Sequence, residues 1–358
     1  MECTTKFNDF ISAISLTGSM EKELRTAYKD LKNRLNSHKI SKEIIAMFLQ
    51  GSYARHTGVI PINKDDKLDV DLVVVTRFDY HQMTPLQALQ AFVPFLEENY
   101  KGKYQIQGRS LGIKLEKCSI DLVPTALPNI TVQRFLDEAF NNAAYEESFF
   151  RANSTINAIK KYAKADDDWK KEPLKIPDRE AEKWDDTHPL AQIFWTQNMN
   201  EKTNGEYIRM VRALKWWKKN YCENADTIKS YPLEHFIGDC CAVGQDSLAK
   251  LITFTLQNMS SYDEMKKPYL PDRGVPQHDV FGRVKDEDYK NFIKAIKDIT
   301  EKAKNALEEQ DLYESSLKWR NIFGPSFPIY NKPSSDNNEP KFTKREDYSR
   351  PDKPSRYA

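Results

Sequence analysis

Two aspartates separated by one residue stand at the start of a branched aliphatic run: Asp69 and Asp71 flank Val70 and lead into residues 72–75. Side chains alternate across a strand, so both carboxylates project from one face while Val70 projects from the other, towards a core. Two neighbouring anions need a cation between them, and carboxylate oxygens on a rigid strand suit Mg²⁺, which also binds substrate phosphates. The pair therefore predicts a magnesium site.

A third carboxylate, Asp121, lies in a second apolar segment at 118–123. Ile120 and Leu122 fall on its core face, and Asp121 falls on the opposite face. An Asp-x-Asp pair alone is common in solvated turns, but acids at the mouth of a buried strand are costly without a function. Asp65 and Asp66 belong to a charged surface turn, and we leave them out of the predicted site.

The segment Gln50-Gly51-Ser52 ends another apolar run, at 44–49. Glycine lets backbone amides approach a phosphate closely, and the serine hydroxyl can donate a hydrogen bond to it. The alternative is an ordinary turn between a strand and a helix. The position of this turn shortly before the Asp69 strand favours a nucleotide-binding turn.

Composition limits the class of protein. The chain has 358 residues, 39% of them hydrophobic, which allows a large core and suggests two domains. Its 54 Lys and Arg against 53 Asp and Glu give a net charge of +1, which disfavours a long nucleic acid substrate. Apolar stretches are too short to cross a membrane and no signal peptide is visible, so we expect a cytoplasmic protein. Five cysteines without a Cys-x-x-Cys pair and six scattered histidines give no zinc site.

Hydrophobic periodicity predicts an α+β core followed by a helical domain. A helix at 20–37, strands at 44–49, 69–75, 104–106 and 111–115, and a helix after the capping box Thr84–Gln87 make a mixed sheet with helices within residues 1–165. Pro94 should kink or shorten the helix after the box. A helix begins at 155, and the charged stretch 166–188 reads as a long connection.

The second domain is expected at 166–327. Its helices are predicted at 189–197, 206–220, 232–241, 247–260, 286–308 and 313–323. Residues 328–358 are rich in proline and polar residues without hydrophobic periodicity, which predicts a flexible tail. Aromatic and basic residues of this tail leave open whether it folds onto a partner.

Two residues of the second domain are candidates for nucleotide contact. Lys215 falls on the apolar stripe of its helix, with Ile208 and Val211. A cation on an apolar face is stabilised by a nearby anion, and a bound triphosphate would supply one. The alternative is a lysine that snorkels at the stripe edge. Tyr231, at the start of the next helix, could stack on a base or pack in the core.

Together these residues resemble the bacterial cGAS/DncV-like nucleotidyltransferases (CD-NTases) of CBASS anti-phage systems, particularly clade D, over nearly the whole ordered chain. The motifs that carry the resemblance are Gln50-Gly51-Ser52 with Thr57, Asp69-Val70-Asp71-Leu72-Val73-Val74-Val75, Gly108-Arg109-Ser110, Ile120-Asp121-Leu122-Val123, Thr187-His188-Pro189-Leu190-Ala191-Gln192, Val211-Arg212-Ala213-Leu214-Lys215-Trp216-Trp217 and Tyr231-Pro232-Leu233-Glu234-His235.

The resemblance implies a polymerase-beta-like nucleotidyltransferase core joined to a helical domain like that of oligoadenylate synthetases, with the active site between them. By position, Asp69 and Asp71 would hold two Mg²⁺ ions, and Asp121 would hold one and orient the attacking hydroxyl. Ser52 and Lys215 would bind the donor triphosphate. Thr57 and Arg55 would support the turn, and His56 is given no role.

The implied reaction joins ATP and other nucleoside triphosphates into a cyclic di- or trinucleotide second messenger, with an adenine-rich trinucleotide favoured. The resemblance also implies that a ubiquitin-transfer-like enzyme conjugates the terminal Ala358 to another molecule. Two alternatives stay open. One is a linear nucleotidyltransferase acting on RNA or protein; the other is an inactive nucleotide-binding scaffold, which the presence of all three aspartates disfavours.

Overall fold

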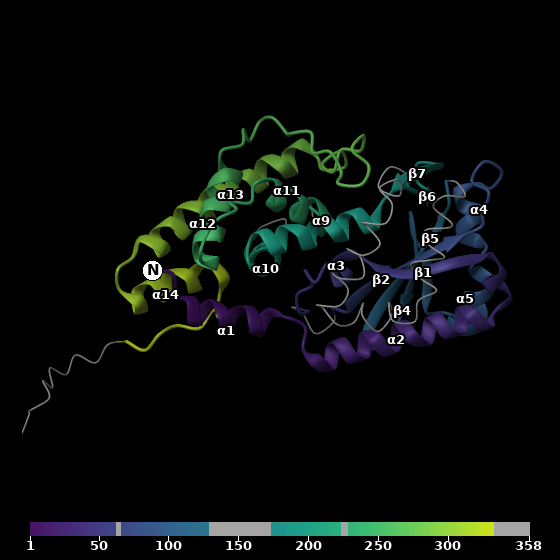
Figure 1. Cartoon of the computed structure of the whole chain (residues 1–358), viewed down its shortest axis with the longest axis horizontal. Helices are drawn as coiled ribbons and strands as arrows, with labels where there is room; N and C mark the ends of the chain where they lie inside the picture. Colours follow the sequence, from purple (N-terminus) through teal and green to yellow (C-terminus); the bar gives the residue numbers. More distant parts are fainter. Residues whose placement is uncertain (62–65, 129–172, 223–227, 333–358) are drawn as a thin grey trace, which may run out of the picture.

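The computed structural model describes residues 1–61, 66–128, 173–222 and 228–332. The described elements form two lobes that lie end to end (Figure 1). We call α2 to β7 the sheet lobe, and α1 with α9 to α14 the helical lobe. The two main hydrophobic clusters follow this division except at α9, which contributes Ile193 to the sheet-lobe cluster and Met199 to the other. The mixed sheet with its helices confirms the expected α+β class.

One seven-stranded sheet forms the centre of the sheet lobe. Its main path runs β1-β2-β5-β4-β3, with β6 joined to β5 and β7 to β6. β2 and β5 are parallel and the other pairs are antiparallel. The strands are β1 (Ile44–Gln50), β2 (Leu68–Thr76), β3 (Tyr104–Ile106), β4 (Leu111–Lys114), β5 (Cys118–Ala126), β6 (Leu174–Asp178) and β7 (Lys183–Thr187).

Helices pack on the sheet and bury the hydrophobic core of the sheet lobe between themselves and the strands. They are α2 (Gly18–Ser37), the 3₁₀ helix Lys39–Glu43, α3 (Gly51–Ala54), α4 (Pro85–Gln90) and α5 (Val93–Tyr100). The predicted stripe of α2 is buried, because Leu24, Tyr28, Leu31 and Leu35 all pack into the core. The capping box of Thr84 and Gln87 forms at α4, and the helix is interrupted just before Pro94, as predicted.

The helical lobe is built around aromatic residues. Its helices are α1 (Thr4–Ile14), α9 (Pro189–Lys202), α10 (Glu206–Tyr221), α11 (Ser230–Asp239), α12 (Leu248–Ser260), α13 (Asp286–Glu308) and α14 (Leu312–Phe323). α1 was not predicted. It belongs to this lobe because Phe7 and Phe10 pack against Phe323 and Phe327.

The sequence predicted a long connection at 166–188. This prediction is wrong for residues 174–187, which form the hairpin β6–β7. Leu174 and Ile176 are buried on either side of Lys175, and Lys175 pairs with Asp186 across the hairpin. Asp186 is therefore neutralised within the hairpin, while Asp178 and Asp185 pair with Arg109 of the loop before β4 and with residues of the helical lobe, Arg283 and His278. The helix predicted from 155, the division at residue 165 and the tail from 333 onward lie outside the described residues, so the domain boundaries stay a prediction.

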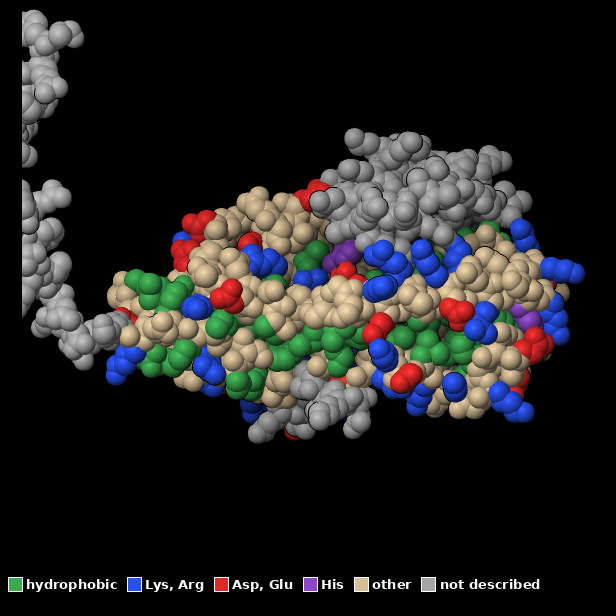
Figure 2. Space-filling model, turned by 90° about the horizontal axis from the view of Figure 1, so that it is seen from below, with side chains coloured by type: hydrophobic (Ala, Val, Ile, Leu, Met, Phe, Trp, Pro, Cys, Tyr) green, Lys and Arg blue, Asp and Glu red, His purple; other side chains and the backbone are tan. Residues whose placement is uncertain are grey.

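The surface carries both signs of charge. On the face shown in Figure 2, acidic and basic side chains are interspersed, and a group of Lys and Arg lies near its middle. In the described part of the chain, no helix is long and apolar enough to span a bilayer.

Candidate active site

The three aspartates lie on two adjacent parallel strands, β2 and β5. Asp71 is directly opposite Asp121, and Asp69 is opposite Ser119, whose hydroxyl donates a hydrogen bond to Asp69 Oδ1. Val70 and Ile120 point into the core between them, as the alternation predicted. Parallel pairing in register thus places all three carboxylates on one face of the sheet.

The carboxylates repel one another electrostatically. Burial raises the pKa of Asp71 to about 6, and Asp121 adds to the shift while Arg55 opposes it. Burial also raises the pKa of Asp121, with Asp69 contributing. In the described residues, no Lys or Arg forms an ion pair with any of the three aspartates.

Clustered, unneutralised carboxylates fit a hard divalent cation that lowers this repulsion. Among the described residues, no group of three acids, histidines or cysteines is already drawn together at the spacing of a metal site. Gln107 Nε2 donates to Asp121 Oδ1 at 3.3 Å, so Asp121 also has a neutral hydrogen-bond partner.

The turn after β1 packs directly against Asp71. Gly51 has a φ of +73°, and a β-carbon on it would lie 1.8 Å from Asp71 Oδ2, so this position requires glycine. Gln50 pairs with Asp71 in the β1–β2 register. The turn is closed by the Thr57 N–H, which donates to the Ser52 carbonyl at 2.9 Å, so Thr57 supports the turn as expected.

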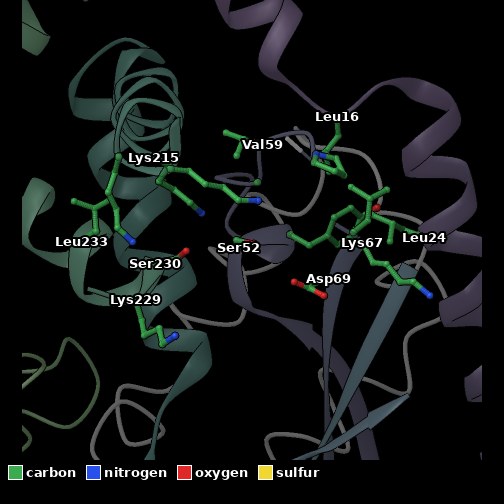
Figure 3. A pocket seen from close by; sticks show the side chains of 16 residues that line it. Leu16, Leu24, Ser52, Val59, Lys67, Asp69, Lys215, Lys229, Ser230 and Leu233 are labelled. Carbon is green, nitrogen blue, oxygen red and sulfur yellow. The ribbon is translucent and has the colours of Figure 1, made fainter. Parts of the chain in front are cut away.

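A cavity of about 220 Å³ lies between the lobes, beside the aspartates. Ser52, Asp69 and Lys215, three of the predicted site residues, line it together. Figure 3 shows Ser52 and Asp69 on one side, and Lys215 and Lys229 pointing in from the helical lobe on the other. The cavity therefore combines one catalytic candidate with the groups expected to bind phosphates.

Four further lysines line this cavity and were not among the predicted site residues: Lys67, Lys218, Lys219 and Lys229. Lys218 and Lys219 follow Lys215 on α10. Lys219 pairs with Asp66 across the lobes at 2.8 Å. Ser230, at the start of α11, also lines the cavity and is exposed. A cavity lined by five lysines suits a polyanionic ligand such as a triphosphate.

Lys215 is not a snorkelling lysine. It is buried, and its Nζ donates to Glu234 Oε1 at 2.8 Å, while Arg55 Nε donates to Glu234 Oε2 at 3.0 Å. Arg55 therefore does more than support the turn, since it reaches from the sheet lobe to α11. Neither contact was predicted.

Tyr231 lies apart from the residues that line the cavity. Its hydroxyl donates to Asp272 Oδ2 at 2.6 Å, and its ring faces the Arg55 guanidinium, with 5.3 Å from Cζ to the ring centroid. Burial raises the pKa of Tyr231, and Asp272 adds to the shift. Base stacking by Tyr231 stays a prediction.

Comparison with known proteins decides the family. The sequence model of the Second Messenger Oligonucleotide or Dinucleotide Synthetase domain matches residues 1–149. The chain is 37% identical to the cyclic AMP-AMP-GMP synthase of Enterobacter hormaechei subsp. hoffmannii over 383 aligned positions that cover 100% of both proteins. The chain belongs to the cGAS/DncV-like nucleotidyltransferases. A cyclic AMP-AMP-AMP synthase of Acinetobacter sp. is 24% identical and aligns with 92% of this chain and 86% of its own length.

Solved structures of this family share the fold. E. coli MS115-1 CdnC with ATP superposes with a TM-score of 0.65 at 14% identity, over 91% of this chain and 98% of that one. Vibrio cholerae DncV cyclic AMP-GMP synthase superposes with a TM-score of 0.64 at 13% identity, over 91% and 96% of the two chains. The two-lobed arrangement is therefore that of these cGAS/DncV-like enzymes.

Proposed function

We propose that this cGAS/DncV-like nucleotidyltransferase is a cyclic oligonucleotide synthase that makes an adenine-rich cyclic trinucleotide as a second messenger in anti-phage defence. The observation that carries the proposal is the set of three carboxylates, Asp69, Asp71 and Asp121, on adjacent parallel strands beside a lysine-lined cavity. The names of the relatives, cyclic AMP-AMP-GMP synthase and cyclic AMP-AMP-AMP synthase, support a trinucleotide product.

In the proposed reaction, a ribose hydroxyl of one nucleotide attacks the α-phosphorus of another. A new P–O bond forms, the bond from the α-phosphorus to the oxygen that bridges the α- and β-phosphates breaks, and pyrophosphate leaves. Repetition and a final intramolecular attack close the ring. The protein supplies no covalent nucleophile, so its contribution is positioning and charge stabilisation.

Each group has a defined part in this scheme. Ser52 and the lysines of the cavity bind the donor triphosphate and offset its charge. Asp121 orients the attacking hydroxyl. When bound to Asp69, Asp71 and Asp121, two Mg²⁺ ions, or Mn²⁺, would lower the pKa of that hydroxyl and neutralise charge on the pyrophosphate.

The partners of the proposed synthase are nucleoside triphosphates, and we place the reaction in the cytoplasm, where these substrates are made. The net charge of +1 supports small nucleotides over a long nucleic acid. Conjugation at Ala358 by a ubiquitin-transfer-like enzyme is part of the proposal, although Ala358 lies outside the described residues. Mass spectrometry of protein co-expressed with its neighbouring genes tests it, since an exclusively unmodified C-terminus would contradict conjugation.

Product analysis distinguishes the proposal from its alternatives. Purified protein is incubated with Mg²⁺ and each combination of labelled ATP, GTP, CTP and UTP, and the products are treated with phosphatase and identified by mass spectrometry. A ring has no terminal phosphate and keeps one phosphate per nucleoside after phosphatase treatment, whereas a linear oligomer loses its terminal phosphates and keeps one fewer, so the masses differ. Transfer to added RNA or protein would favour the linear alternative.

A further inference from the structure

The carboxylate of Glu234 joins two cations that come from different lobes. Lys215 belongs to α10, while Arg55 follows α3 in the sheet lobe. Glu234, Arg55 and Lys215 are 4%, 6% and 8% exposed, so the contacts are shielded from solvent. Burial acts to raise the pKa of Glu234, but Arg55 and Lys215 outweigh it and hold the pKa at about 2, which keeps Glu234 ionised.

Both cations are connected to groups that line the cavity. Lys215 lines it directly, and the Arg55 N–H donates to the Gly51 carbonyl at 3.1 Å, within the turn that carries Ser52. The Tyr207 hydroxyl donates to the Glu234 carbonyl at 3.2 Å and fixes this part of α11. Glu234 thus links Lys215 to the Ser52 turn through Arg55.

An anion at this place is unfavourable for binding a triphosphate by charge alone, because it offsets two nearby cations. The presence of Glu234 is explained if the positions of Lys215 and Arg55 matter more for nucleotide binding than the summed charge of the site. A lysine on a flexible stem loses less rotamer freedom on binding when a bonded partner already fixes it.

We propose that Glu234 is a positioning residue that fixes Lys215 relative to the Ser52 turn, so that both act on one donor triphosphate. The inference rests on the proposed function. It assigns to Glu234 no contact with the substrate.

Replacing Glu234→Gln separates geometry from charge. The amide keeps the size of the side chain, but its one carbonyl oxygen can accept from only one of the two cations, while its NH₂ group repels the other. Charge alone predicts tighter nucleotide binding, because an anion is removed. Loss of positioning predicts weaker binding, so the direction of the change decides between them.

The experiment measures binding of an ATP analogue with a methylene group between the α- and β-phosphorus atoms, by calorimetry with Mg²⁺ and the full chain. We expect Glu234→Gln to weaken binding by about tenfold, and the KM for ATP to rise more than kcat falls. Glu234→Asp keeps the charge but is one methylene shorter and cannot reach both cations, so it should also bind more weakly.

Asp66→Asn is the matched control. It removes the same charge from another lobe-bridging pair at the same cavity, Asp66–Lys219, whose side chains are 29% and 44% exposed, and should leave binding unchanged or tighter. Unchanged or tighter binding by Glu234→Gln would overturn the positioning role. If Glu234→Gln fails to fold in a thermal unfolding assay, wild-type binding by Glu234→Asp would overturn it instead. Failure of the wild-type protein to bind the analogue would contradict the proposed function itself.

Discussion

Gly51 packs so closely against Asp71 that any side chain at residue 51 would occupy the position of the carboxylate. A β-carbon would lie 1.8 Å from Oδ2 and 2.7 Å from Cγ of Asp71. The glycine of the turn proposed to bind nucleotide is therefore also a steric requirement of the strand that carries Asp69 and Asp71.

Gly51→Ala should abolish activity by displacing Asp71. Gly102→Ala is the matched control, because Gly102 has nearly the same φ, +72° against +73°, but no atom lies within 4 Å of its added β-carbon. Both variants should lose about 1 kcal/mol of stability from the left-handed backbone, measured by urea unfolding. Only Gly51→Ala should lose activity, by about 100-fold or more; equal activity of the two variants would contradict the steric argument.

Asp71→Asn should stabilise the metal-free protein while inactivating it. The pKa of Asp71 is raised from 3.8 to about 6, which means that the folded protein favours the protonated carboxyl group. The contribution of Asp71 to the free energy of unfolding therefore falls as pH rises from about 4 to about 6. In EDTA at pH 8 we expect a gain on the order of 1 to 3 kcal/mol for the variant, and a smaller gain at pH 5. Urea unfolding at both pH values checks this, and a loss of stability at pH 8 would contradict it.

Asp178→Asn should loosen the contact between the lobes. Burial acts to raise the pKa of Asp178, but the Ala181 N–H, Arg109 and Arg283 hold it at about 2, against an ordinary value of 3.8. This stabilisation is present above pH 3.8 and is lost as pH falls towards 2. Because both arginines are partly exposed, we expect a cost of about 2 kcal/mol at neutral pH in thermal unfolding.

The control for Asp178 is Glu264→Gln, which breaks an exposed pair with Lys297. It should cost much less than Asp178→Asn, because the pair is solvated. Equal effects of the two substitutions would show that burial of Asp178 contributes nothing.

Gln107 should affect kcat through its hydrogen bond to Asp121. Its Nε2 donates to Asp121 Oδ1 at 3.3 Å, and the Ser110 hydroxyl donates to its Oε1 at 2.7 Å, which fixes the orientation of the amide. Gln107→Ala should lower kcat by about tenfold with little change in the KM for ATP. Gln105→Ala is the control, because Gln105 is an exposed residue of β3, and it should leave kcat unchanged. A change confined to KM would contradict a role through Asp121.

Local pattern was enough to predict the strands that carry the acids. In β2 and β5, alternation and branched apolar residues agree with burial on one face, and the segment boundaries differ from the predicted ones by only a few residues. The strands β6 and β7 were missed because β7 is mostly polar, and its acids are neutralised by partners such as Arg109 and Lys175 from other segments.

The other unpredicted features of the site are contacts between segments that are distant in the sequence. Arg55 and Glu234 are 179 residues apart, and no periodicity relates them. Lys229 and Ser230 reach the cavity only because α11 begins there. Lys218 and Lys219 lie close to Lys215 in the sequence, but charges spaced in this way are equally typical of a solvated helix face.

The most direct test of the account compares ring synthesis in three proteins: the wild type, Asp69→Ala/Asp71→Ala, and Asp66→Asn. Each is incubated with Mg²⁺, ATP and GTP, and the phosphatase-treated products are identified by mass over time, because a ring keeps one phosphate per nucleoside whereas a treated linear oligomer keeps one fewer. We predict a ring from the wild type and from Asp66→Asn, and none from the double variant, with all three folded. A ring from the double variant, or only linear product from the wild type, would contradict cyclic oligonucleotide synthesis at these carboxylates.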